Sequence, residues 1–233
     1  LPHRDGDRLL YLRQSRDGPG GENLNFSVPE VRDLRTGVRS FAALAEYSAY
    51  GGILDGDGGS PTARIGVGLV TGNYFEVMGL APILGRLTGP GDDGPGVPPV
   101  MVLTAPFWLN RFGGDSGIVG RQVMFNGKSV TVIGVVQPAP SFPNRIDVFC
   151  NMVISSHHLS ASMVEGRVHR MTEVVARLTP TATVEQSRAE VDAVYGRLQE
   201  AFPDAYEHAR HCRVAVIPFK QVLGERAQLT LWL

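Results

Sequence analysis

The sequence predicts an α+β protein with two subdomains. Each end of the chain carries a strand–helix–strand pattern, at residues 8–70 and 173–218, and the middle is rich in short strands. Two such end units can share one sheet with their helices on one face, as in the split β-α-β architecture. We therefore expect a discontinuous subdomain from residues 1–79 and 165–226, with a smaller α+β subdomain inserted at residues 80–164.

The first strand is expected at residues 8–13, and a helix follows a polar loop. Ser27 can cap this helix, and Glu30 lies three residues later, which completes a capping box. Pro29 is tolerated in the first turn because its missing N–H would have no partner there. Gly37 is expected to end the helix.

A strand is expected at residues 41–50, followed by a turn at 51–59 that is rich in glycine and aspartate. The next strand, at residues 64–70, alternates between apolar and small residues, which is typical of a half-buried strand. The side chains expected on its buried face are Ile65, Val67 and Leu69.

The middle of the chain starts with a helical turn at residues 74–77 and an exposed loop at 89–99. A strand is expected at residues 100–103, and then a helix that Thr104 caps and Gly113 ends. Prolines interrupt regular structure at residues 138–143, and a strand is expected at 146–153. A loop or short helix is expected at residues 155–170.

The clearest local signal is the Asn126-Gly127 dipeptide between two apolar stretches. Asn-Gly favours the type I′ turn of a two-residue β-hairpin. That turn fixes the register of the hairpin and places its apolar residues on one face. The predicted cross-strand pairs are Val123 with Val130 and Phe125 with Lys128.

Near the end of the chain, residues 173–178 alternate as a strand does, and Thr183 with Gln186 forms a second capping box. The helix that follows has apolar residues at helical spacing. Pro203 is expected to stop it before a final strand at residues 213–218. The residues predicted to face the core are Val174, Ala176, Leu178, Val184, Ser187, Val191, Val194, Leu198 and Ala201.

Composition excludes some functions and leaves other points open. Lys plus Arg is 22 and Asp plus Glu is 23, so the formal charge is -1. Nucleic acid is therefore a poor candidate partner. Cys150 and Cys212 are expected to be two separate buried thiols, and the alternative is one bridge between them. The apolar residues 227–233 are expected to start a membrane-spanning helix, and the alternative is a buried terminal strand or helix.

Several motifs resemble catalytic or metal sites, but structural explanations fit them better. Ser116 lies in a Gly-Asp-Ser-Gly stretch like that of trypsin-like proteases, but the only matching dipeptide, His211-Cys212, comes after it in the chain. A glycine-rich turn that ends a helix is the preferred interpretation. Gly66 and Gly68 lie inside a strand, so close packing explains them better than dinucleotide binding. The P-loop pattern is absent from the sequence, so we expect no ATP hydrolysis by this chain.

The sequence lacks the common zinc motifs, and its histidines are expected to be exposed loop residues. They include His157, His158, His169, His208 and His211. Asp55, Asp57, Asp92 and Asp93 suggest calcium, but the EF-hand pattern is absent and turn chemistry accounts for them. We expect no catalytic, cofactor-binding or metal-binding residues.

A set of stretches in a fixed order resembles the extracytoplasmic core domain of MacB-like ABC transporter permeases, and is most similar to duplicated permeases of acidobacteria. The stretches are SVPEVRDLR (27–35), SFAALA (40–45), VTGNYFEVMG (70–79), PILGR (82–86), VMVL (100–103), WLNRFGGD (108–115), IVGR (118–121), VIGV (132–135) and ARLTP (176–180). One departure is Asp147-Val148-Phe149-Cys150, which stands where the family usually has an aspartate-valine-tryptophan strand.

The resemblance implies a porter-like α/β subdomain built from both chain ends and a smaller inserted subdomain. It also implies a position outside the cytoplasmic membrane, between the first two membrane helices of a permease. The partners it implies are a cytoplasmic ATPase subunit that binds the ATP, a periplasmic adaptor, and a second copy in a full-length dimer. It offers no catalytic residues.

Three functions follow from these observations. The leading hypothesis is a non-enzymatic transport module that moves when a cytoplasmic subunit hydrolyses ATP. The second is an extracytoplasmic module that binds a ligand or a lipoprotein in a cleft. The third is a secreted hydrolase that uses Ser116 and a histidine.

Overall fold

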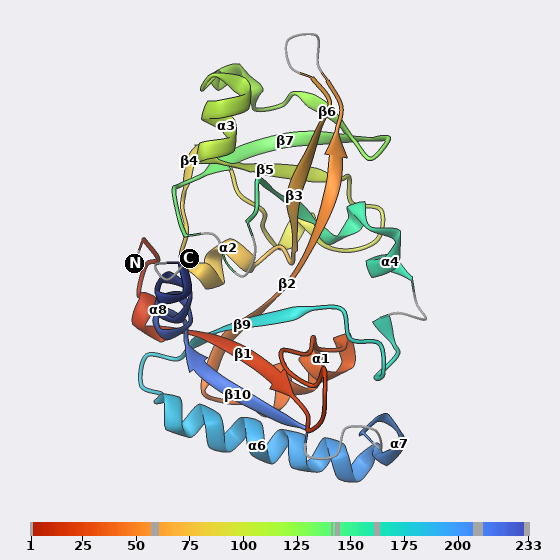
Figure 1. The fold of residues 1–233 in the computed structure, drawn as a ribbon, viewed down its shortest axis with the longest axis vertical. Helices are drawn as coiled ribbons and strands as arrows, with labels where there is room; N and C mark the ends of the chain where they lie inside the picture. The colour runs from red at the N-terminus through yellow and green to blue at the C-terminus, as the bar shows by residue number, and fades with distance from the viewer. Residues whose placement is uncertain are drawn as a thin grey trace. The chain divides into compact units, whose positions relative to one another are not determined.

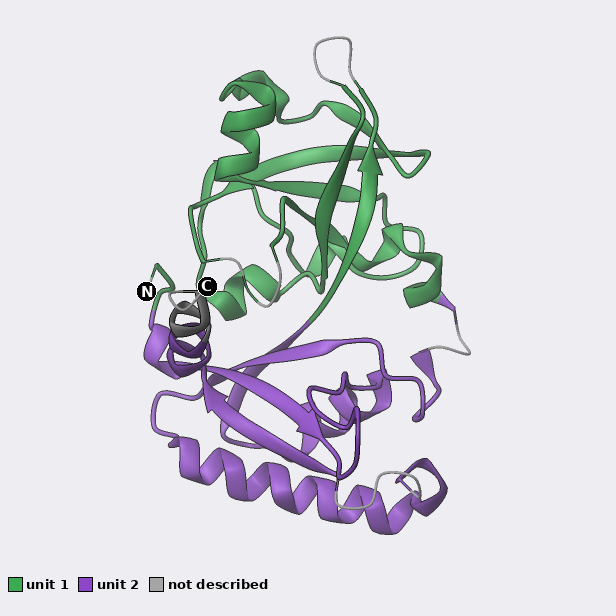
Figure 2. Ribbon diagram, viewed as in Figure 1, with its two compact units in different colours: residues 1–4, 47–159 green, residues 5–46, 160–233 purple. Residues whose placement is uncertain are grey.

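The computed structural model describes residues 2–56, 61–140, 142, 145–160, 164–206 and 212–230, with side chains up to residue 225. The chain splits into two compact units (Figure 2). Unit 1 comprises Leu1–Arg4 and Tyr47–Leu159, and unit 2 comprises Asp5–Glu46 and Ser160–Leu233.

The two units share the α+β character that the sequence predicts. Unit 2 contains η1 (Gly6–Arg8), β1 (Leu9–Ser15), α1 (Val28–Gly37), β9 (Glu173–Leu178), α6 (Val184–Ala201), α7 (Pro203–Tyr206), β10 (Arg213–Pro218) and α8 (Phe219–Thr230). Strand β2 (Phe41–Leu54) begins in unit 2 and ends in unit 1. Unit 1 adds β3 (Ala63–Val70), α2 (Tyr74–Met78), β4 (Pro82–Gly85), η2 (Pro90–Asp92), β5 (Val100–Thr104), α3 (Ala105–Phe112), η3 (Ser116–Ile118), β6 (Gln122–Phe125), β7 (Lys128–Val136), β8 (Val148–Asn151), η4 (Met152–Ile154) and α4 (Ser156–Leu159).

In unit 2, strand β1 lies between β10 and β9 and is antiparallel to both, and the strand order is β10-β1-β9-β2. Helix α6 packs against β10 and α1 (Figure 1). Both predicted capping boxes are present, at Ser27 with Glu30 and at Thr183 with Gln186. Removal of apolar side chains from water stabilises this arrangement. Its core includes Leu10, Leu12, Val31, Leu34, Val174, Ala176, Leu178, Val191, Val194, Leu198, Val214 and Val216.

In unit 1, the strand order is β2-β3-β8-β5-β7-β4, and β6 pairs with β2 and β7. Strand pairs β3–β8 and β5–β7 are parallel, whereas β2–β3, β5–β8 and β4–β7 are antiparallel. The predicted face of β3 is confirmed, because Ile65, Val67 and Leu69 are buried in the unit's core. Helix α3 packs against β5 and β7 (Figure 1).

The predicted hairpin is confirmed residue by residue. Val123 pairs with Val130 and Phe125 with Lys128. Asn126 and Gly127 have φ angles of 49° and 74°, the left-handed values that a type I′ turn requires. Asn126 also accepts a hydrogen bond from the Ile53 backbone N–H at 2.8 Å, which attaches the turn to β2.

The boundary between the units differs from the predicted one. The sequence suggested an insert at residues 80–164, whereas unit 1 comprises Leu1–Arg4 and Tyr47–Leu159. The reason is that β3 pairs with β8, a strand of the middle of the chain, as well as with β2. Pairing with β3 also extends β2 to Leu54, where a turn at residues 51–59 was predicted. Residues 57–60 lie outside the described residues.

Two other local predictions need correction. The Thr104 hydroxyl does not cap α3, because it donates to the Asp147 carbonyl oxygen at 2.9 Å. The strand predicted at residues 146–153 is limited to β8, because Met152 begins a 3₁₀ turn. Residues 227–230, predicted to start a membrane helix, lie in α8, which begins at Phe219, and residues 231–233 lie outside the described residues, so this stays a prediction. Among the described residues, no helix combines the length and the apolar character needed to cross a membrane.

Candidate functional site

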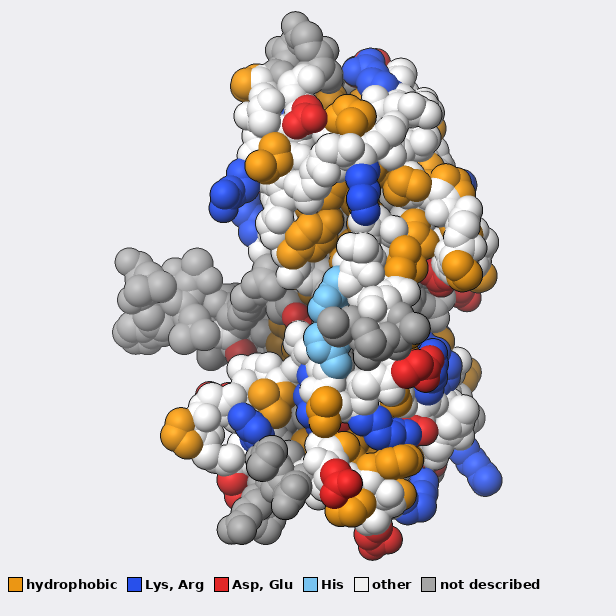
Figure 3. All heavy atoms as spheres, turned by 90° about the vertical axis from the view of Figure 1, so that its right-hand side faces the viewer, with side chains coloured by type: hydrophobic (Ala, Val, Ile, Leu, Met, Phe, Trp, Pro, Cys, Tyr) orange, Lys and Arg blue, Asp and Glu red, His pale blue; other side chains and the backbone are white. Residues whose placement is uncertain are grey.

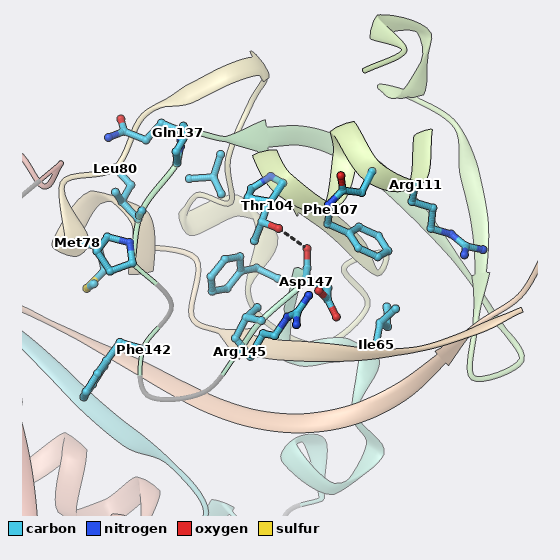
Figure 4. A pocket seen from close by; sticks show the side chains of 18 of the residues that line it. Ile65, Met78, Leu80, Thr104, Phe107, Arg111, Gln137, Phe142, Arg145 and Asp147 are labelled. Carbon is cyan, nitrogen blue, oxygen red and sulfur yellow. Dashed lines mark hydrogen bonds between the residues drawn. The ribbon is translucent and has the colours of Figure 1, made fainter. Parts of the chain in front are cut away.

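Unit 1 contains a pocket of about 790 Å³. Its walls come from the start of β3, helix α2, helix α3 and the segment between β7 and β8 (Figure 4). The apolar part of the lining includes Ile65, Tyr74, Met78, Leu80, Pro106, Phe107, Val136, Phe142, Ile146 and Phe149. Pockets of this size and character bind drug-sized organic molecules in many proteins.

The charged groups of the pocket are three arginines and one aspartate, namely Arg64, Arg111, Arg145 and Asp147. Arg111 Nη2 donates to the carbonyl oxygens of Asp55 at 3.3 Å and Pro61 at 2.8 Å. Arg64 and Arg145 are exposed, and neither forms an ion pair within the described part of the chain. The pocket lining therefore carries an excess of positive charge.

Asp147 holds the floor of the pocket in place. Its carboxylate accepts the Gly66 backbone N–H at 2.9 Å, and its own N–H donates to the Gly66 carbonyl oxygen at 2.8 Å. Its carbonyl oxygen accepts both the N–H and the hydroxyl of Thr104, at 3.0 and 2.9 Å. Asp147 thus joins the start of β8 to β3 and to the start of α3.

The two glycines of β3 are explained by close packing, as predicted. A Cβ at Gly66 would lie 2.4 Å from the carbonyl oxygen of Arg145. A Cβ at Gly68 would lie 2.9 Å from the rings of Phe149 and Tyr47. The Phe149 ring packs against Tyr74 and Phe75.

Ser116 is exposed at the start of η3, in the turn that the sequence predicted. Asp115, its neighbour, accepts the Gly117 N–H at 2.8 Å and the Arg121 guanidinium at 3.0 Å. Gly113 ends α3 with φ 61°. Asp115 therefore stabilises the turn that follows α3. His211, the histidine of the protease-like dipeptide, lies outside the described residues.

Both cysteines are free and buried, which confirms two separate thiols. Burial raises the pKa of Cys212 to about 11 and also raises the pKa of Cys150. A thiol reacts as its thiolate. Both groups are therefore expected to be unreactive in the folded protein at neutral pH.

Asp92, Asp93 and His158 form hydrogen bonds within the protein, and Asp57, His208 and His211 lie outside the described residues. Asp92 is buried, contrary to the exposed loop expected at residues 89–99, and accepts two bonds from Arg86 at 2.7 and 2.9 Å. These bonds lower the pKa of Asp92. Asp93 accepts the Gly72 N–H, and His158 contacts the hydroxyls of Ser155 and Ser48. Across the described residues, no group of three His, Cys, Asp or Glu could hold a metal ion.

Unit 2 contains a buried polar network that the sequence did not predict. Glu30, predicted only as a helix cap, also accepts bonds from Gln14 at 3.0 Å, Tyr206 at 2.9 Å and Arg170 at 3.3 Å. The donors lie at distant positions in the sequence, so local spacing gives no signal for them. The network connects α1, α7, β1 and the segment before β9.

The first and last elements of unit 2 lie side by side. Helix α8 contacts η1 and β1, and its Phe219 and Val222 are buried. Lys220 pairs with Asp7 at 2.8 Å, and Glu225 pairs with Arg13 at 3.6 Å. The segment that precedes β1 and the helix that follows β10 are therefore neighbours in this unit.

Both signs of charge occur on the face drawn in Figure 3, among the residues that the structure describes. On the face drawn in Figure 3, Lys and Arg side chains are interspersed with Asp and Glu, in line with the formal charge of -1. Hydrophobic side chains on this face occur in small groups among polar ones.

The fold is that of a mixed α+β domain with two compact units. The family model for the MacB-like periplasmic core domain matches residues 1–194, and the chain belongs to this family. No curated protein matches the chain in sequence.

Solved structures agree with this assignment at the level of the fold. The periplasmic region of MacB from Actinobacillus actinomycetemcomitans is 16% identical, with a TM-score of 0.64 over 94% of both chains. A domain of a candidate permease from Porphyromonas gingivalis is 16% identical, with a TM-score of 0.65 over 93% of both chains. The extracellular domain of the ABC-type transporter YknZ from Gram-positive bacteria is 14% identical, with a TM-score of 0.60 over 90% of this chain and 99% of that one.

Proposed function

We propose that the chain is the extracytoplasmic, non-catalytic domain of an ABC-type permease. In this proposal, ATP hydrolysis by a cytoplasmic subunit moves the membrane helices, and the domain passes that movement to a substrate or partner outside the membrane. A periplasmic adaptor and a second copy of the permease are further partners that the proposal includes. Unit 2 would be the porter-like subdomain and unit 1 the inserted one.

The observation that carries the proposal is the contact of α8 with η1 and β1. A folded domain inserted between two membrane helices needs its entering and leaving segments close together, because both connect to neighbouring helices. Inserted domains in general meet this requirement. The buried Phe219 and Val222 hold α8 on unit 2, so a displacement of α8 would move the unit.

A non-catalytic role is supported by the contacts of the carboxylates and thiols, the groups that could otherwise act in catalysis. The carboxylates of Asp92, Asp115 and Asp147 are engaged by backbone N–H groups or arginines, and both thiols are buried. Mechanical work needs stiff packing and two stable arrangements rather than a reactive side chain.

The proposal is tested by excising the domain from the full-length permease. Residues 5–230 are replaced with a short glycine-serine linker, which can join the flanking segments because η1 and α8 lie side by side. ATP hydrolysis by the complex in proteoliposomes should continue. In a strain that lacks the permease, the excised form should fail to restore the phenotype that the intact permease restores.

The matched control is Ser116→Ala in the full-length permease, which should restore that phenotype fully. Restoration by the excised form would contradict a coupling role for the domain. Loss of function in the serine variant would instead favour a hydrolase.

A further inference from the structure

We propose that the pocket of unit 1 binds a small amphipathic organic anion, whose acidic headgroup contacts Arg145 and Arg64 and whose apolar body lies against Phe107 and Ile65. The inference concerns a ligand site within unit 1 and does not depend on the transport role. The inference is based on two features of the same pocket. The pocket is largely apolar with a volume of about 790 Å³, and its lining includes Arg64 and Arg145, which form no ion pair among the described residues.

The positive charge of the pocket lining favours a ligand with a negative charge. Asp147 already accepts the Gly66 N–H, so its carboxylate is partly satisfied by the protein. Arg64 and Arg145 have no carboxylate partner among the described residues. A guanidinium is weakly hydrated and its planar donors match a carboxylate, sulfonate or phosphate, so an anion gains from this site and a cation is repelled.

Arg145 is held where it can act on a ligand. Its carbonyl oxygen packs against Gly66, where a Cβ would lie only 2.4 Å away. Two residues later, Asp147 is fixed by its bonds to Gly66 and Thr104. Figure 4 shows Arg145 beside Asp147 in the middle of the pocket, with Phe107 on the α3 side and Met78 and Leu80 on the α2 side.

The apolar walls of the pocket favour a ligand whose body is apolar. Aromatic and aliphatic side chains from α2, α3 and β3 surround the charged centre, so a purely polar anion would leave this apolar surface in contact with water. A molecule with two or three rings, or a medium-length acyl chain, fits the volume typical of drug-sized sites. The ligand class is therefore an amphiphile with one acidic headgroup.

The test uses two fluorescent probes with the same ring system and different charge. 8-Anilinonaphthalene-1-sulfonate carries a sulfonate, and N-phenyl-1-naphthylamine lacks it. Titration of the 233-residue chain should give saturable binding of the sulfonate at one site, about tenfold tighter than the amine, as one charge-assisted bond would give. Decanoate should displace the sulfonate probe.

Variants locate the site. Arg145→Gln should remove most of the preference for the sulfonate, and Arg145→Lys should keep part of it. Arg213→Gln, an exposed arginine of unit 2 that pairs with Asp17, is the control and should change neither affinity. Because Arg145 is exposed and forms no ion pair in the described region, its loss should leave the circular dichroism spectrum unchanged.

The inference is overturned by any of three results. They are the absence of saturable sulfonate binding, equal affinity for the two probes, and an Arg145→Gln variant that binds them as the parent chain does.

Discussion

Replacing Glu30 with alanine should lower the free energy of unfolding of unit 2 by about 3–5 kcal/mol, the cost of breaking a buried charge pair. Glu30 is fully buried. Its carboxylate accepts bonds from Ser27, Gln14, Tyr206 and Arg170. Alanine would leave the Arg170 guanidinium and several neutral donors without their acceptor, and would remove the capping box of α1. Urea denaturation measures the change.

Two further variants separate the buried network from ordinary surface charge. Glu30→Gln keeps the size and one acceptor oxygen but faces the Ser27 N–H with an amide donor, so an intermediate loss is expected. Glu165→Ala removes the exposed partner of Arg32 and should cost at most about 1 kcal/mol. If the Glu30 and Glu165 alanine variants unfolded at the same urea concentration, the buried network would not hold unit 2 together.

Replacing Gly66 with alanine should destabilise unit 1 by about 1–3 kcal/mol, the usual cost of overpacking a well-packed site. The new methyl group would lie 2.4 Å from the carbonyl oxygen of Arg145. That oxygen cannot move freely, because Asp147, two residues later, is hydrogen-bonded to Gly66. The Asp147 carboxylate accepts the Gly66 N–H, and the Asp147 N–H donates to the Gly66 carbonyl oxygen. Urea denaturation should show the loss, and sulfonate probe binding should weaken in parallel because the same contact positions Arg145.

The matched control lies directly across the sheet. Gly51 in β2 pairs with Gly66 in register, and a Cβ at Gly51 would meet nothing within 4 Å. Gly51→Ala should therefore leave the stability unchanged or raise it by up to about 1 kcal/mol, because alanine restricts the unfolded chain. Equal destabilisation by the two variants would show that loss of glycine flexibility, and not the Arg145 contact, causes the effect.

The parts of the fold that the sequence predicted depend on interactions between near neighbours. The Ser27 and Thr183 capping boxes span three residues, and the Asn126-Gly127 turn fixes its own register. The parts it missed depend on distant partners. Strand β2 continues to Leu54 only because β3 pairs with it, and β3 belongs to unit 1 because it also pairs with β8.

The candidate site was harder to predict than the fold. Arg64, Arg111 and Arg145 lie on separate segments, and no spacing rule connects them before the sheet of unit 1 forms. Only the strand glycines gave a hint, because Gly66 indicated a close approach of another segment, which proved to be the one that carries Arg145. The Glu30 network was hidden because Gln14, Arg170 and Tyr206 reach it from different elements.

Cysteine labelling of the full-length permease tests most directly whether the domain lies outside the cytoplasmic membrane. Leu109→Cys in unit 1 and Val168→Cys in unit 2 introduce thiols at positions that are 56% and 69% exposed, while the native thiols are buried. In a parent permease whose cysteines outside these 233 residues are replaced by serine, and with the cytoplasmic membrane intact, a membrane-impermeant maleimide should label both variants and leave the parent unlabelled. Labelling of either variant only after that membrane is ruptured would contradict the account.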